Sequence, residues 1–277
     1  QTFFETYRRY QDSVFYDASA WSLANFYNID YSPQRRFRGG EEVRSLEGMF
    51  EAGLVEPSQY AYIIDGNDYN APALLYRLQS EGLVLASAFK PFTTRVDGKE
   101  KSFDYGALVL PVQLQSKPPK LVYQLLKEAQ EALNVPAFAV ASGYHVSGVD
   151  LGSSNIRPLK KPKVALLIGE GVRSYEAGEV WHLLDTRVGM PIAKIPLRNF
   201  DRTGLDEYNT LVMVSGNYRF SESQQQKIKD WVAAGNTLVA VGSAAAYAVE
   251  KDWVSESLVT AEKDSTASVD PLPYVEA

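Results

Sequence analysis

Three glycine-bearing turns in the second half of the sequence stand where an α/β protein would bind a ligand. Gly169 with Gly171, then Gly216, then Gly242, each follow a short apolar run. In an open parallel sheet, ligands bind outside the carboxyl ends of the strands, where loops lead into helices. Glycines at such places also serve simply to permit tight turns, and that interpretation stays open. If the turns form one crevice, the candidate ligand-binding residues are Glu170, Ser174, Tyr175, Glu176, His182, Ser215, Gly216, Asn217, Gly242 and Ser243.

The first of these turns is a near miss to the fingerprint of a dinucleotide-binding loop. Ser174 stands where the last glycine is needed, and Glu170 places negative charge where a pyrophosphate would lie. No acidic residue follows the next apolar run, at Pro196-Leu197, to hold a ribose. We therefore expect no nicotinamide or flavin cofactor.

The segment 241–246 lies between an apolar run and a predicted helix, which is the setting of a nucleophile elbow. An active elbow takes a histidine base from later in the sheet, and no histidine follows this one. Ser243 would need His145 or His182 as its base, and nothing in the sequence brings either histidine to it. The other interpretation is a turn of small residues that lets a helix approach the sheet.

The sequence offers little to a metal ion. Glu179 and His182 are three residues apart on a predicted helix and could share a face, as metal-ligand pairs do. Two ligands are too few for a closed site, and the only other histidine, His145, lies in the other half of the chain. The absence of cysteine excludes disulfides, thiolate metal sites and cysteine nucleophiles. We predict no catalytic residue and no metal site in this chain.

Four apolar runs are expected to position the candidate crevice. They are typical of parallel strands buried on both faces and cover residues 164–168, 192–195, 211–214 and 237–241. A well-marked helix separates the last two, because Ser221 and Gln224 fit a capping box and Gly235 stands where a left-handed cap belongs. This pattern predicts a flavodoxin-like parallel sheet.

The first half of the sequence alternates in the same way. Asp97-Gly98 is a two-residue hairpin signal, and Asn70 with Pro72 marks the start of a helix. Strands are predicted at 60–64, 83–89, 107–112 and 135–141, and a second helix at 119–133. The fold class is therefore α/β, with two three-layer units.

Composition divides the chain into four parts. Residues 1–39 hold ten aromatic side chains within the first 31 positions, which we expect to pack on a neighbouring surface. Residues 40–155 form the first α/β unit and 162–254 the second, and residues 153–163, with two prolines and three lysines, read as a linker. Residues 255–277 are rich in Ser, Asp, Glu and Pro, which predicts a loosely ordered tail.

Charge and hydropathy exclude several classes of partner. The 277 residues include 28 basic and 34 acidic side chains, a net charge of −6, without the basic stripe that nucleic-acid binding requires. No apolar run reaches the roughly 18 residues that span a bilayer. Residue 1 is Gln, and no signal-peptide pattern follows it, so we expect the chain to begin inside a longer precursor.

Several strings in the sequence resemble a known family. VALLIGEGVRSYEAGEVWHLLD at 164–185, YNTLVMVSGNY at 208–218 and WVAAGNTLVAVGSAAA at 231–246 look like the class I glutamine amidotransferase-like domain that follows the catalytic domain in a group of bacterial zinc carboxypeptidases. FYDASAWSLANFYNIDY at 15–31 is similar to the stretch that joins the two regions in those proteins. The resemblance thus covers most of the chain, and SYEAGEVWHLLD is its most specific part.

The resemblance implies an exported bacterial precursor, periplasmic or extracellular, whose upstream domain binds zinc through an HxxE pair and a later histidine. No HxxE occurs in this chain, so zinc and proteolysis are expected only upstream. At the amidotransferase elbow the resemblance places Ala244, which has no nucleophilic atom. The chain is then a non-catalytic accessory region that supports the upstream peptidase domain of the same precursor or binds a peptide, glycan or small molecule.

One alternative from another class stays open. The chain could be a stand-alone α/β hydrolase, or a small-ligand-binding protein, that uses the crevice near Glu170, Glu176 and Ser243. A hydrolase would need a histidine or a carboxylate with a shifted pKa in that crevice.

Overall fold

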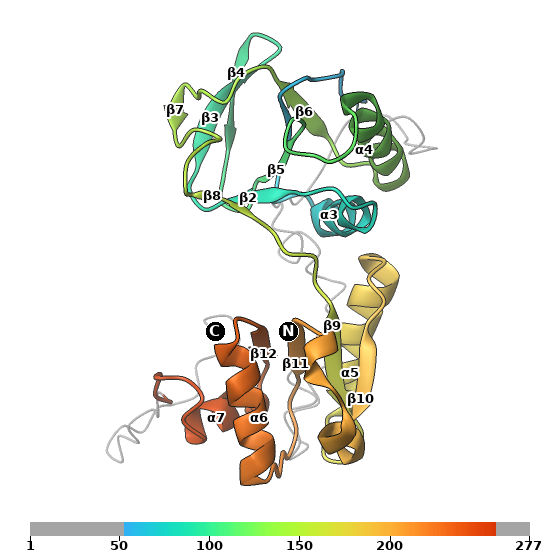
Figure 1. Ribbon diagram of the computed structural model, residues 1–277, viewed down its shortest axis with the longest axis vertical. Helices are drawn as coiled ribbons and strands as arrows, with labels where there is room; N and C mark the ends of the chain where they lie inside the picture. The colour runs from blue at the N-terminus through green and yellow to red at the C-terminus, as the bar shows by residue number, and fades with distance from the viewer. Residues whose placement is uncertain (1–52, 259–277) are drawn as a thin grey trace, which may run out of the picture. The chain divides into compact units, whose positions relative to one another are not determined.

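The computed structural model describes residues 53–258, which form an α/β protein with three sheets (Figure 1). The α/β fold class predicted from the sequence is therefore confirmed. The aromatic-rich segment 1–39 and most of the predicted tail 255–277 lie outside the described residues.

The first half of the described chain is built on a five-stranded sheet in the order β6-β1-β5-β2-β8, with every pair antiparallel. The strands are β1 (Ala61–Ile64), β2 (Ala86–Ala88), β5 (Leu108–Pro111), β6 (Ala137–Val140) and β8 (Ile156–Pro158). A smaller sheet, β4-β3-β7, contains β3 (Phe92–Val96), β4 (Lys99–Phe103) and β7 (Ser147–Gly148). Two helices, α3 (Ala71–Ser80) and α4 (Pro119–Leu133), complete this part.

The alternation of side chains along β1 sets the layers. Tyr62 and Ile64 pack in the cluster that holds the inner faces of α3 and α4. Ile63, which points to the opposite face, packs with Phe92 and Phe103 of the small sheet. The three layers are therefore a helix pair, the five-stranded sheet and the small sheet.

Local signals account for several of these elements. Asp97 and Gly98 both have positive φ angles, 49° and 76°, as a two-residue turn between β3 and β4 requires. Asn70 stands at the N-cap of α3 as predicted, but its side-chain amide donates to the Leu133 carbonyl (2.9 Å) rather than capping its own helix. The expected linker is interrupted, because Ile156–Pro158 pairs with β2 as an edge strand.

The second half is built on a four-stranded sheet in the order β10-β9-β11-β12, with every pair parallel. The strands are β9 (Val164–Ile168), β10 (Ala193–Pro196), β11 (Thr210–Met213) and β12 (Thr237–Ala240), and the helices are α5 (Ser174–His182), α6 (Glu222–Ala233) and α7 (Ser243–Glu250). This is the layered arrangement of a flavodoxin-like fold. The strand order reverses between β9 and β11, the switch point where ligands bind in open parallel sheets.

Helices cover both faces of this sheet. Leu166 and Val212 face α5 and pack with Ala177, whereas Leu167 and Leu211 pack against α6. The predicted capping box of α6 is present, because the Ser221 hydroxyl accepts from the Gln224 amide (3.2 Å) and the Gln224 side chain accepts from the Ser221 amide (2.9 Å). Gly235, with φ 93°, ends the helix as predicted.

We predicted that all four strands are buried on both faces, and for the two edge strands, β10 and β12, that is wrong. In β10, Lys194 is exposed. Val239 and Val241 expose 39% and 45% of their surface, although Leu238 and Ala240 pack on the other side. The reason is position, since β12 is an edge strand and only one of its faces packs in a helix-covered cluster.

Candidate functional site

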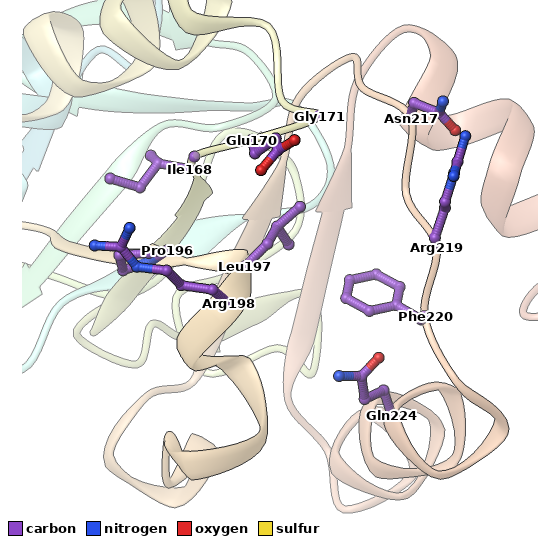
Figure 2. A pocket seen from close by; sticks show the side chains of 11 residues that line it. Ile168, Glu170, Gly171, Pro196, Leu197, Arg198, Asn217, Arg219, Phe220 and Gln224 are labelled. Carbon is purple, nitrogen blue, oxygen red and sulfur yellow. The ribbon is translucent and has the colours of Figure 1, made fainter.

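A crevice of about 760 Å³ opens at the switch point, outside the carboxyl ends of β9, β10 and β11 (Figure 2). The loop after β9 contributes residues 168–171, and residues 196–198 contribute where β10 ends. The connection between β11 and α6 contributes Asn217, Arg219 and Phe220, with Gln224 from the first turn of the helix. Three neighbouring strands thus bring residues from distant parts of the sequence to one place.

The crevice combines an apolar interior with a charged rim. Leu197 and Phe220 are half-buried, whereas Glu170, Arg198 and Arg219 are exposed. Phe220 is held by an aromatic cluster, with its ring centroid 5.6 Å from that of Tyr218, 6.1 Å from Tyr247 and 6.3 Å from Trp253. The apolar wall is therefore rigidly supported.

The two loops at the switch point are fixed to each other by backbone hydrogen bonds. The amide of Asn217 donates to the Gly171 carbonyl (2.7 Å), and Val172 and Gly216 form an antiparallel bridge. A Cβ atom on Gly216 would lie 2.7 Å from that same Gly171 oxygen, so only glycine allows this approach. The crevice is accordingly preformed.

Beside the crevice lies a hydrogen-bonded group that we call the elbow network: Glu176, Ser215, Gly216, Gly242 and Ser243. The Ser215 amide donates to the Glu176 carboxylate (2.8 Å), and the Ser215 hydroxyl donates to the same carboxylate. These bonds, with a smaller contribution from Arg173, hold the pKa of Glu176 below its ordinary value.

Hydroxyl groups also occupy the amides of the elbow network. The Ser243 amide donates to the Ser215 hydroxyl (3.3 Å), and the Gly216 amide donates to the Ser243 hydroxyl (2.9 Å). The Ser243 hydroxyl in turn donates to the Gly216 carbonyl (3.2 Å). Each of these groups therefore already has a partner within the protein.

The strained residue of the strand-to-helix turn is Gly242, with φ 58° and ψ −128°, a conformation that side chains rarely adopt. A nucleophile elbow places its nucleophile on such a strained turn. The expected elbow position, Ala244, is instead fully buried in the core of the second sheet. A Cβ at Gly242 would overlap the Ser215 hydroxyl and lie 3.9 Å from Glu176 Oε2, so the apex carries no reactive atom and has no room for one.

Burial and the nearby Glu176 charge act together on Tyr218. They raise the pKa of its phenol to about 12, with burial the larger cause. Its hydroxyl donates to the Val214 carbonyl (2.7 Å), directly before the elbow network. Tyr218 is therefore a neutral donor that holds the end of β11 in place.

The structure separates the predicted site residues into four groups. Glu170 and Asn217 line the crevice, and the elbow network contains the five residues Glu176, Ser215, Gly216, Gly242 and Ser243. Ser174 lines a separate cavity of about 520 Å³ beside Trp181 and Lys194. Tyr175 is 90% exposed, and His182 is exposed at the end of α5; neither lines a described cavity.

Neither histidine lies in the crevice, since His145 packs in the first half of the chain and His182 is exposed. His145 stacks on Phe92, with ring centroids 4.2 Å apart, and its Nδ1 contacts the Val149 carbonyl in the first half of the chain. Among residues 53–258 no group of three or more His, Cys, Asp or Glu side chains is arranged to hold a metal ion. No helix in that same range is long and apolar enough to cross a bilayer.

Sequence reasoning missed most of the lining, because only Glu170 and Asn217 of its residues were among the candidates. Leu197, Arg198, Arg219 and Phe220 were not candidates, because only strand ends that carry glycine were considered. The end of β10 lies at the same edge as the other strand ends, since the sheet is parallel. That rule alone would have found Leu197 and Arg198.

Comparison of the chain with protein-family models, with curated proteins and with solved structures finds no match in any of the three.

Proposed function

We propose that this chain is a non-catalytic, ligand-binding accessory region, and that it belongs to an exported bacterial protein of the zinc carboxypeptidase-like type. The observation that carries the proposal is Gly242 at the apex of the elbow, beside an open and preformed crevice.

Nucleophilic catalysis at the elbow is disfavoured, because each of the groups that it requires is absent or already bonded. Nucleophilic catalysis requires an attacking atom, a base that takes its proton and free donors for the developing oxyanion. Gly242 supplies no attacking atom, and the amides of Gly216 and Ser243 are bonded to hydroxyl groups. Ser215 does contact a carboxylate, but the lowered pKa of Glu176 makes it a weak base.

Ligand binding is favoured by the crevice itself. Its volume of about 760 Å³ lies within the range of roughly 300 to 1,000 Å³ that is typical of small-molecule sites. Apolar walls at Leu197 and Phe220 and a few polar groups around them are the usual composition of such sites. The switch point of a doubly wound sheet is also their usual place.

The assignment to the zinc carboxypeptidase-like type rests on the resemblance of four sequence segments to that family. They are residues 15–31, 164–185, 208–218 and 231–246. Under this proposal zinc and peptidase chemistry belong to an upstream domain, and this region supports that domain or binds a ligand for it. The exported location follows from the same resemblance.

The test combines turnover, metal content and binding on the purified chain. We expect no stoichiometric zinc and no hydrolysis of carboxypeptidase substrates, chromogenic esters or glutamine. We also expect at least one compound from a panel of short peptides, amino acids and oligosaccharides to raise the melting temperature. Leu197→Trp should abolish that shift by filling the crevice, whereas Leu114→Trp, at a 77% exposed position elsewhere, should preserve it.

Two turnover results would contradict the non-catalytic part of the proposal. Stoichiometric zinc together with carboxypeptidase turnover by the isolated chain would place the chemistry here. Hydrolysis of an ester or amide that Glu176→Gln and Ser243→Ala abolish would instead favour the stand-alone hydrolase.

A further inference from the structure

The crevice carries charges of both signs that have no partner among the residues that the structure describes. Within residues 53–258, the side chains of Glu170, Arg198 and Arg219 form no hydrogen bond and no ion pair. Figure 2 shows Arg198 and Arg219 on opposite sides of the opening, with Glu170 on the loop after β9. A bound ligand would therefore meet two guanidinium groups and one carboxylate.

Phosphate is a poor match to this site. Anion sites at strand ends use free backbone amides, but here the Arg173 and Asn217 amides donate to carbonyl groups of the facing loop (2.9 and 2.7 Å). The Val172 amide donates to the Gly169 carbonyl of its own loop (3.0 Å). Glu170 adds a negative charge at the same loop. These three amides are therefore not available to an anion, and side-chain charges set the preference for a ligand.

A neutral sugar is also a poor match. Sugars need several neutral hydrogen-bonding groups, yet both ends of the Gln224 amide are occupied, by Asp201 and by the Ser221 amide. Of the neutral polar side chains that line the crevice, this leaves Asn217, between charged groups. The lining favours a ligand that carries charges of its own.

We propose that the crevice binds a short peptide with both termini free, about two or three residues long. Its carboxylate pairs with Arg198 or Arg219, its ammonium group with Glu170, and an apolar side chain packs on Leu197 and Phe220. Guanidinium groups bind carboxylates through two parallel hydrogen bonds, which makes a free carboxyl terminus the natural partner of Arg198 or Arg219. This inference rests on the proposed function and specifies the ligand class of the same crevice.

The test titrates the purified full chain with alanyl-phenylalanine and with its N-acetylated and C-amidated forms in a calorimeter. We expect the free dipeptide to bind and each blocked form to bind at least about tenfold more weakly, because each block removes one charge-assisted contact.

Charge-removing variants assign the contacts. Glu170→Gln should abolish the preference for a free amino group, and the double variant Arg198→Met with Arg219→Met should abolish the preference for a free carboxylate. Glu207→Gln and Arg202→Met, exposed charges in the same half of the chain that do not line the crevice, should leave both preferences unchanged.

Equal binding of free and blocked dipeptides, or preferences that survive these variants, would overturn the inference while leaving a ligand-binding crevice intact. Binding of a neutral sugar or inorganic phosphate in place of the peptide, still blocked by Leu197→Trp, would overturn it in the same way. If no compound binds in a Leu197→Trp-sensitive manner, the proposed function itself fails.

Discussion

Replacing Gly242 by alanine tests the elbow most sharply. At φ 58° and ψ −128° a side chain costs about 1–3 kcal/mol of backbone strain. The new Cβ would also overlap the Ser215 hydroxyl and displace it, and overpacking of this kind costs about 1–3 kcal/mol. The reduced entropy of the unfolded chain returns about 0.4–1 kcal/mol. We therefore expect a net loss of about 1–5.6 kcal/mol.

The loss of stability caused by Gly242→Ala should depend on the Ser215 hydroxyl. In a Ser215→Ala background the obstructing hydroxyl is absent, and the Ser215 Cβ lies 3.4 Å from the new methyl group, an ordinary contact. Gly242→Ala should then cost only the backbone strain less the entropy gain, about 0–2.6 kcal/mol. The two substitutions are thus predicted to be strongly coupled.

Urea unfolding followed by tryptophan fluorescence measures this, because three of the four tryptophans, 181, 231 and 253, lie in the second half of the chain. Gly235→Ala is the matched control, since its φ is 93° but nothing lies within 4 Å of an added Cβ. An equal cost of Gly242→Ala with and without the Ser215 hydroxyl would refute the reasoning.

Three further predictions concern the same half of the chain. Folding lowers the pKa of Glu176, so the contribution of this carboxylate to stability is present at neutral pH and lost as the pH falls below about 4. Acid unfolding of Glu176→Gln should therefore depend less on pH than that of the wild type. An identical pH profile would contradict this. Folding raises the pKa of Tyr218 to about 12, so the stability of the wild type should fall as the pH rises from about 10 towards that value. The stability of Tyr218→Phe should fall less steeply. An equal fall in melting temperature for both proteins at alkaline pH would argue against this prediction. Gly178→Ala should raise the free energy of unfolding by up to about 1 kcal/mol, because an added Cβ in α5 meets nothing within 4 Å. A lower free energy of unfolding in urea would mean that position 178 has no room for a side chain.

Elements with short-range signals were predictable from the sequence. Residues 164–168 form β9 with the predicted bounds, and the α6 capping box and the Asp97-Gly98 hairpin are present. For the capping box and the hairpin turn the decisive interactions join residues at most a few positions apart, and for β9 the run of apolar residues is itself local. The α/β class followed from the same alternation of runs.

Features that depend on strand order were not predictable. The exposure of Val239 and Val241 follows from the edge position of β12, which no local pattern encodes. Likewise β8 looks like a linker until β2 pairs with it.

The candidate site also has features that the sequence predicted and features that depend on the fold. Its glycine turns were visible in the sequence, but Arg198 and Arg219 reach the crevice only because β10 and β11 flank β9. Gly242 was recognised as part of an elbow, but its role as the apex depends on backbone angles, and Ala244 was named instead.

The central claim is that the crevice binds a ligand and that the chain does not turn it over. One calorimetric titration of alanyl-phenylalanine into wild-type chain and into Leu197→Trp, with the recovered peptide analysed by mass spectrometry, tests both halves. We predict saturable binding at one site in the wild type, none in the variant, and intact peptide. Cleaved peptide, or equal binding by both chains, would contradict the account.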